Sequence, residues 1–497
     1  MKKLLFTVVF FLSVTPSASA YYEFDRKLEK AYQLIFSLDF NGAAILIEEE
    51  RNEKPDNCLS LLYLNYIDFL KAYISEDKND FDILKSHSEQ RLEEVIKIKE
   101  NASSPFHLYV QSEIHIQQAL AGIKCEENFF AAKEIKRAYG LIEKNEITFP
   151  TFLLNKKVSG FLQVVIGSVP SRFLWIVRIA GMKGSIINGV HDLKEVYQLS
   201  GLSEFKSYQT EILFYLGTIY SGFSLLENAN EILPEMLPHA FNSQLIGYVC
   251  SNILMKQGKN DEAIAILESC IKIRTVYPVA FLYYKRGLAR LRKMDLGSSE
   301  DFEYYLKNYK GRNSIKSAYQ KLSWIALLKG DTALYKTELE LSQSKGTAFL
   351  DEDKEASYEA ASGEIINVYL MRARLFFDGG YYSKALKEIV GRKITDFKHF
   401  HDQLEITYRL GRIMQMEGQT DKAVEYFLTT LKNGASSSYH YAANSSLMLG
   451  NIAEKKNDFN GASEYYKKCL SLSYDRYKNS IDQKAKVGLE RIHDRVK

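Results

Sequence analysis

Apolar residues in the C-terminal half of the chain recur at spacings of three and four, the period of an amphipathic helix. Several blocks also share a second pattern, in which a small residue is followed by Gly or Asn seven positions later and by Ala twelve positions later. This pattern occurs within residues 245–272, 367–390, 405–432 and 444–471. Small residues let two antiparallel helices approach closely, and Gly or Asn ends the first helix in a left-handed turn. The spacing therefore predicts a series of helix hairpins.

Weaker copies of the pattern extend the series toward the N-terminus. Gly287 and Ser323 with Gly330 mark two of them, and Leu38–Ala43 with Pro55 marks a probable first copy. The chain has eight prolines and none after Pro278, so helices can follow one another there without a proline break. Further helical patterns cover residues 58–76, 79–99, 105–123 and 127–145.

We therefore expect an all-α fold, a right-handed superhelical solenoid of antiparallel helix hairpins. A polar stretch rich in acidic residues suggests one longer connection, and a final amphipathic helix with a charged outer face suggests a cap. The expected organisation is a signal peptide at 1–20, divergent helical hairpins at 21–240, central repeats at 241–342, the polar connection at 343–363, C-terminal repeats at 364–474 and a capping helix at 475–497.

The four clear blocks resemble tetratricopeptide repeats, although the closing proline is absent and the periods of 36 to 39 residues exceed the usual length of about 34. Most of the chain also resembles the family of tetratricopeptide repeat protein thirty-nine and the inclusion-body-clearance proteins. That resemblance implies a superhelix with an interaction role and no catalytic residues, although the family's intracellular eukaryotic setting conflicts with an export signal. The segments that carry it are Asp39–Ala43, Gln111–Leu120, Ala131–Tyr139, Gly160–Pro170 and Gly181–Leu193.

The first twenty residues have the pattern of a secretory signal peptide. Lys2 and Lys3 precede an apolar run from Leu4 to Val14, and Ala18 and Ala20 offer a cleavage site. The run is too short for a membrane span, and no cysteine follows it to carry a lipid anchor. We expect an exported protein, periplasmic or extracellular and not a lipoprotein. Removing two lysines changes the net charge from +3 to +1, which argues against nucleic acid as a partner.

Cysteine and histidine give little support for redox or metal chemistry. The five cysteines include no Cys-x-x-Cys pair. Cys250 and Cys270 lie within one expected hairpin, and the sequence leaves open whether they form a disulfide. Among nine histidines, only His399 and His401 group together; a metal there would need ligands from elsewhere, and a solvated loop at a helix start is the favoured interpretation. No catalytic motif occurs, so we expect no enzyme, no cofactor and no metal.

Residues 158–171 form an uncharged run that is too short to span a membrane. We expect a buried helix–turn–helix here, with close helix crossings or turns at Gly160, Gly167, Gly181, Gly184 and Gly189. The alternative function is binding of an apolar or carbohydrate ligand in an aromatic pocket around 161–177; a deep pocket lined by Phe173 and Trp175 would favour it over an open concave face.

The concave face of the solenoid is the expected binding surface, because the first helix of each repeat lines it. Tyrosine, arginine and asparagine there suit a groove that holds an extended peptide. We therefore predict a non-catalytic scaffold that binds a protein or an extended peptide, with a role in envelope assembly or secretion, and without a transmembrane span. The candidate contact residues are Tyr248, Asn252, Lys256, Tyr284, Asn367, Arg374, Tyr408, Arg412, Asn451 and Lys455.

Overall fold

The computed structural model describes residues 24–98, 103–169, 177, 181–223, 225–273 and 277–495. Every regular element within these residues is a helix, which confirms the expected all-α class. The expected signal peptide at 1–20 lies outside the described residues. In the described part of the chain, no helix combines the length and the apolar character needed to cross a membrane.

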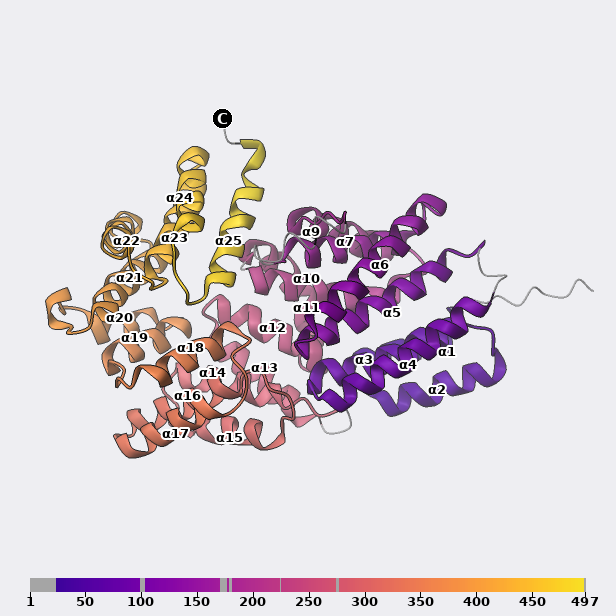
Figure 1. Ribbon diagram of the computed structural model, residues 1–497, viewed down its shortest axis with the longest axis horizontal. Coiled ribbons are helices and arrows are strands. Elements are labelled where there is room, and N and C mark those ends of the chain that lie inside the picture. The colour runs from indigo at the N-terminus through magenta and orange to yellow at the C-terminus, as the bar shows by residue number, and fades with distance from the viewer. Residues whose placement is uncertain are drawn as a thin grey trace, which may run out of the picture.

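Helices of the N-terminal lobe pair with their chain neighbours as hairpins (Figure 1). The helical patterns expected from residue 58 to 145 correspond closely to α3–α6. The lobe contains α1 (Arg26–Phe36), α2 (Phe40–Glu53), α3 (Leu59–Ser75), α4 (Lys78–Lys97), α5 (Pro105–Lys124), α6 (Asn128–Thr148), α7 (Leu153–Gly167), α9 (Ile186–Ser200), α10 (Gln209–Phe223) and α11 (Leu226–Ala240).

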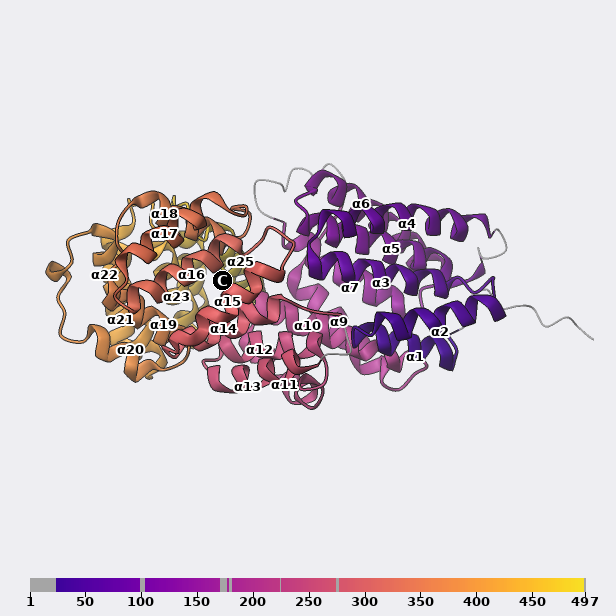
Figure 2. The same cartoon turned by 90° about the horizontal axis from the view of Figure 1, so that it is seen from below.

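The helices from α12 onward make up what we call the C-terminal lobe; the turned view shows α12 and α13 beside α10 and α11, with α14–α24 toward the end of the molecule opposite α1–α7 (Figure 2). The helices from α12 onward are α12 (Gln244–Lys256), α13 (Asn260–Lys272), α14 (Phe281–Arg292), α15 (Ser299–Asn308), α16 (Ile315–Leu328), α17 (Thr332–Ser344), α18 (Asp351–Ser362), α19 (Val368–Asp378), α20 (Tyr382–Ile389), α21 (Phe400–Met416), α22 (Thr420–Gly434), α23 (Tyr441–Lys455), α24 (Phe459–Ser471) and α25 (Lys478–Arg491).

The four clear sequence blocks each fold as one hairpin, with the predicted left-handed residue at the turn. Small residues on the first helix receive aromatic rings from the second. A Cβ on Gly411 would lie 2.7 Å from the ring of Phe427, so these two helices approach more closely than a larger residue would permit. The turn residues with positive φ are Gly258, Gly380, Gly418 and Asn457.

Two of these turns also touch each other, although they lie far apart in the sequence. Gly258, between α12 and α13, packs directly on Gly380, between α19 and α20, with φ angles of 76° and 81°. Any side chain at Gly380 would collide with the backbone carbonyl of Gly258. Asn260 donates a hydrogen bond to the Tyr381 hydroxyl at 3.2 Å beside this contact. The hairpins therefore wind tightly enough for backbone to meet backbone.

The expected polar connection at 343–363 contains a helix, α18. Acidic residues fill its first turn, where negative charge interacts favourably with the helix dipole. One of them, Asp353, is buried and accepts hydrogen bonds from the backbone N–H groups of Ser314 and Ser317 at 2.6 and 3.0 Å. The acidic run is thus a packed helix start, which composition alone did not indicate.

The final helix does more than close the solenoid. α25 packs against α23 and α24, as a cap would, and also contacts α9 and α10 of the N-terminal lobe (Figure 1). Gln483 donates a hydrogen bond to the backbone carbonyl of Ser168 at 2.6 Å, and Ser185 donates one to Glu490. Because Ile481 and Val487 are both buried, α25 uses more than one face for packing and joins the two lobes.

The glycine-rich region after residue 158 forms the expected close crossing. A Cβ on Gly160 would lie 2.9 Å from Asp192, and one on Gly189 would collide with the Gly160 carbonyl, so α7 and α9 cross at these glycines. Phe161 packs on Tyr215 with ring centroids 4.5 Å apart. Phe173 and Trp175, which define the expected aromatic pocket, lie outside the described residues.

A charged triad lies in the core of the N-terminal lobe and was not anticipated from the sequence. Lys157 of α7 places Nζ 2.5 Å from Glu211 of α10 and 3.0 Å from Glu113 of α5. All three side chains are at most 3% exposed. Tyr32 and Tyr66 also donate hydrogen bonds to Glu211, at 2.7 and 2.6 Å. The triad ties helices from five hairpins together around one carboxylate.

The two carboxylates of the triad respond differently to burial. Burial raises the pKa of Glu113, and Lys157 only partly offsets this. Burial acts the same way on Glu211, but Lys157 and the tyrosine hydroxyls outweigh it and lower the pKa of that carboxyl. Glu211 therefore carries the negative charge that balances Lys157.

Replacing Lys157 by Met should destabilise the protein strongly, because the buried charge of Glu211 loses its partner. Breaking a buried pair from one side costs about 3–5 kcal/mol. Glu211→Gln should cost a similar amount, whereas Glu113→Gln, which mimics the protonated acid, should cost no more than about 1 kcal/mol. Urea denaturation followed by circular dichroism measures these differences; equal losses for the two glutamine variants would contradict the assignment of charge.

Substitutions of two left-handed glycines should separate backbone strain from the contact between hairpins. Gly330 has φ +82° and open space around it, so Gly330→Ala should cost about 1–2 kcal/mol from the left-handed conformation alone. Gly380→Ala adds a collision with the Gly258 carbonyl and should cost about 1–3 kcal/mol more. The difference in denaturation midpoint is the measurement, and equal losses would show that the contact can relax freely.

Candidate functional site

The ten candidate residues lie on or at the start of the first helices of their hairpins, but they have different environments. α12 carries Tyr248, Asn252 and Lys256, of which Lys256 is exposed. Arg374 of α19 and Arg412 of α21 are half-buried. Lys455, at the end of α23, is exposed and lies 4.0 Å from Glu227 of α11.

Four of the ten candidates make contacts within the solenoid itself. Tyr284 and Tyr408 are 3% and 4% exposed, so their rings belong to the core. Asn367 caps α19 by accepting hydrogen bonds from two backbone N–H groups, and Asn451 accepts one from the Tyr466 hydroxyl at 2.8 Å. These four side chains stabilise the repeats and offer little surface to a partner.

Six positive side chains from five helices face one another on the inner side of the C-terminal lobe. Repulsion couples Lys256 to Lys285, Arg292 and Lys484, and it also couples Arg292 to Arg374 and Lys484 to Arg412. The contributing helices are α12, α14, α19, α21 and α25, with two of these residues on α14. We call this set the inner cation cluster: Lys256, Lys285, Arg292, Arg374, Arg412 and Lys484.

Aromatic rings lie beside several of these cations, and none of the cations is directly paired with a carboxylate among the described residues. Among the described residues, no member of the cluster forms an ion pair with a carboxylate within 4.0 Å. Lys285 lies 5.3 Å from the ring centroid of Phe281, and Arg374 lies 5.3 Å from that of Trp324. Arg412 lies 4.9 Å from the ring of Phe377 and donates a hydrogen bond to the Tyr408 hydroxyl at 2.9 Å. Ring faces stabilise a cation without neutralising it.

Burial and this mutual repulsion together lower the pKa of two lysines on this side of the lobe. The surrounding protein and then the charges of Lys484, Lys285 and Arg292 lower the pKa of Lys256 to about 7, although part of its side chain is open to water. Burial and Arg374 likewise lower the pKa of Lys321, on α16, to about 7. A group that is costly to protonate in the free protein would be stabilised by an incoming anion.

Nearby carboxylates are committed to other cations. Glu405 is held by Arg409 at 2.7 Å and accepts a hydrogen bond from Tyr441 at 2.8 Å. Glu355 pairs with Arg476 at 3.0 Å. Asp378, the last residue of α19, is the exception: its charge attracts both Arg292 and Arg374, although it forms no ion pair with them within 4.0 Å.

Sequence reasoning found half of this cluster. Lys256, Arg374 and Arg412 are candidates from the repeat pattern, whereas Lys285, Arg292 and Lys484 are not. Lys285 follows the candidate Tyr284 by one position, and the only available signal was the run of basic residues on that helix. Lys484 comes from α25, whose return across the lobes depends on contacts remote in the sequence.

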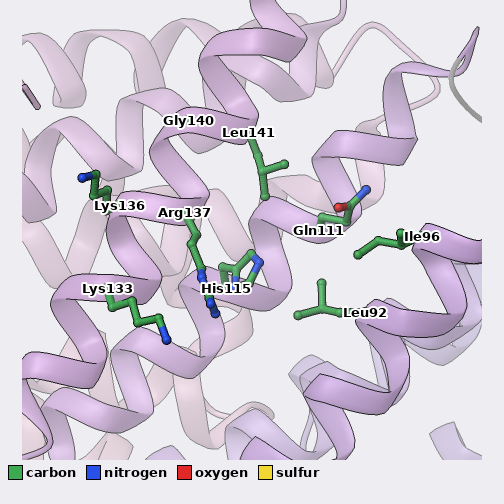
Figure 3. A pocket seen from close by; sticks show the side chains of 9 residues that line it. All are labelled: Leu92, Ile96, Gln111, His115, Lys133, Lys136, Arg137, Gly140 and Leu141. Atoms are coloured by element: carbon green, nitrogen blue, oxygen red, sulfur yellow. The ribbon is translucent and has the colours of Figure 1, made fainter. Parts of the chain in front are cut away.

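A shallow pocket of about 710 Å³ lies in the N-terminal lobe between α4, α5 and α6 (Figure 3). In its lining, Lys133 and Lys136 lie beside His115 and Arg137, which both contact Glu134, at 2.5 and 2.9 Å. Burial acts to raise the pKa of Glu134, but these two partners outweigh it and lower that pKa. The pocket lining is Leu92, Ile96, Gln111, His115, Lys133, Lys136, Arg137, Gly140 and Leu141.

All five cysteines are free thiols, so the Cys250–Cys270 pair is not joined. Cys270 donates a weak hydrogen bond from Sγ to the backbone carbonyl of Ala240 at 3.2 Å. Burial raises the pKa of the Cys250 thiol to about 12 and that of Cys270 to about 11. Both therefore behave as small packing residues with little thiolate character.

Comparison with known proteins supports the repeat assignment. The family model of the tetratricopeptide repeat matches residues 248–276 and 443–476. No curated protein matches the chain. Matches among solved structures include the human IFIT1 dimer with PPP-AAAA, at 12% identity, 90% and 95% coverage and a TM-score of 0.36, and yeast Tom70, at 12% identity, 94% and 88% coverage and a TM-score of 0.25. The chain is thus an all-α solenoid that contains tetratricopeptide repeats.

Proposed function

We propose that this chain is a non-catalytic scaffold that binds an acidic, extended segment of a partner protein on the inner face of its C-terminal lobe. The observation that carries this proposal is the inner cation cluster, whose members form no ion pair within 4.0 Å with any carboxylate of the described residues. Tetratricopeptide repeats support a protein-binding role in general. The chemistry of the cluster narrows the partner to one that brings carboxylates.

Helical repeats favour an extended partner, because successive first helices present side chains at regular intervals along one face. Lys256, Arg374 and Arg412 come from three such helices. The partly buried ring of Phe281 adds apolar contact area next to Lys285. An extended segment with alternating acidic and apolar residues fits this arrangement.

The proposal includes a cellular location for the scaffold. The leader pattern at residues 1–20 favours export, so we propose that the scaffold works in the periplasm or outside the cell, in envelope assembly or secretion. The alternative function, binding of an apolar or carbohydrate ligand around residues 161–177, has less support. The described ring in that segment, Phe161, packs on Tyr215.

Neutralising cluster lysines should weaken binding and stabilise the fold at the same time. Lys256→Gln, Lys285→Gln and Lys484→Gln remove repulsion, so each should raise the free energy of unfolding by about 0.5 kcal/mol. Each should also weaken binding of a fluorescent oligoglutamate peptide about fivefold, or by about 1 kcal/mol. Fluorescence anisotropy and urea denaturation measure the two effects on the same proteins.

The exposed Lys467, on the second helix of its hairpin, provides the matched control, since Lys467→Gln removes the same charge away from the cluster. Oligoglutamine and a single-stranded oligonucleotide are the comparison ligands. Tighter binding of the oligonucleotide than of oligoglutamate would indicate that the partner is nucleic acid and not an acidic protein. If Lys467→Gln weakened peptide binding equally, the effect would depend on net charge alone, which would contradict binding at the inner cation cluster.

Peptide binding should be accompanied by proton uptake. The pKa of Lys256 is about 7 in the folded chain and 10.5 ordinarily. Between pH 7 and pH 10.5 the unfolded chain therefore holds a proton on this lysine that the folded chain lacks. Lys256 thus makes the free energy of unfolding rise with pH across this range. An anionic ligand raises the pKa of Lys256, so binding at about pH 8 should take up protons. Calorimetry in buffers of different ionisation enthalpy measures the uptake, which should shrink in Lys256→Arg; an unchanged uptake would contradict this role.

A further inference from the structure

Two histidines and a glutamate from separate segments meet beside the start of α21. His399 and His401 flank the first residue of α21, and Glu364 lies in the short connection between α18 and α19. Their potential ligand atoms all lie within 4.8 Å of one another. Nδ1 of His399 is 3.3 Å from a carboxylate oxygen of Glu364. The fold thus supplies the third donor that the two histidines lacked in the sequence.

Negative charge at this place is not balanced by a lysine or arginine. Asp402 adds a carboxylate oxygen 3.1 Å from Nε2 of His401. In the described part of the chain, Glu364 and Asp402 form ion pairs only with these histidines. With both imidazoles neutral, the group carries two negative charges and no permanent cation.

The neighbouring charges show that a cation is favoured at this position. Glu364 places a carboxylate oxygen 3.3 Å from Nδ1 of His399, and Asp402 places one 3.1 Å from Nε2 of His401. Two carboxylates from two segments of the chain therefore face the imidazoles, and both favour a metal ion at this position.

In a second cluster of similar composition, a lysine balances the negative charge. His191, Asp192 and Glu195 also lie within reach of one another on α9. Lys156 of α7 already neutralises them, with Nζ 2.5 Å from Glu195 and 3.8 Å from Asp192. The His191 cluster is thus a natural control for composition without an unbalanced charge.

We propose that Glu364, His399 and His401 bind a divalent transition-metal ion, with zinc as the representative. Two imidazoles and one carboxylate suit zinc, and three protein ligands leave one coordination position open. The ligand side chains are between 27% and 45% exposed, so they can adjust to metal–ligand distances without disturbing the core. A bound ion would join the segment that precedes α19 to the start of α21 and so fix the connection between these hairpins.

Isothermal titration of the full chain, purified without a histidine tag, with zinc chloride tests the proposal. We expect one ion per chain, and at least about tenfold weaker binding in His399→Ala, His401→Ala and Glu364→Gln. Zinc should also raise the melting temperature of the unmodified protein and not that of His399→Ala. His191→Ala should bind as the unmodified protein does.

Cobalt absorption identifies the ligand type independently of affinity. Nitrogen and oxygen ligands should give visible bands without the thiolate charge-transfer band that cysteine ligation produces. A thiolate band, absence of binding to the unmodified chain, or unchanged binding in both histidine variants would overturn the proposal. Loss of zinc binding in His191→Ala would show that the ion binds at the His191 cluster on α9 and not at Glu364, His399 and His401. Because these residues lie outside the inner cation cluster, the outcome is independent of the peptide-binding experiments.

Discussion

The tight winding of the hairpins is the constraint on which the inner face depends. Gly258 and Gly380 belong to hairpins that are separated by several others in the chain, yet their backbones touch. That contact requires positive φ and no side chain at both turns, so two glycines set how closely the hairpins of the C-terminal lobe approach. Positive side chains from α12, α14, α19, α21 and α25 face one another because the hairpins are held at this spacing.

The two lobes solve the problem of interior charge in opposite ways. In the N-terminal lobe, Lys157 is buried beside Glu113 and Glu211, and tyrosine hydroxyls complete the hydrogen bonds, as full burial of charge demands. In the C-terminal lobe, the cations keep contact with water and are supported by rings. Their mutual repulsion and partial burial cost some stability in the free protein, and because they keep contact with water their charge stays available to a ligand.

Local pattern predicted the helices and turns because these depend on neighbouring residues. Gly418 and Asn457 were predictable as left-handed turns from spacing alone. Glu211 and Lys484 were not, because their partners come from other hairpins and no periodicity encodes them. α18 was missed for a related reason: its acidic first turn reads as a solvated linker, and only the backbone donors of Ser314 and Ser317 give Asp353 a buried role.

The near neutrality of the chain bears on how a partner would be recognised. With 65 basic against 62 acidic residues, the chain has little long-range field to steer an acidic ligand, and salt screens charges beyond about 8 Å at physiological ionic strength. Recognition must then come from short-range contacts within the inner cation cluster. The buried rings of Trp324 and Phe377 contribute by supporting Arg374 and Arg412 from behind, so that these guanidinium groups keep their charge for a ligand. A local array of this kind favours a specific protein segment over nucleic acid, whose binding draws mainly on phosphate charge.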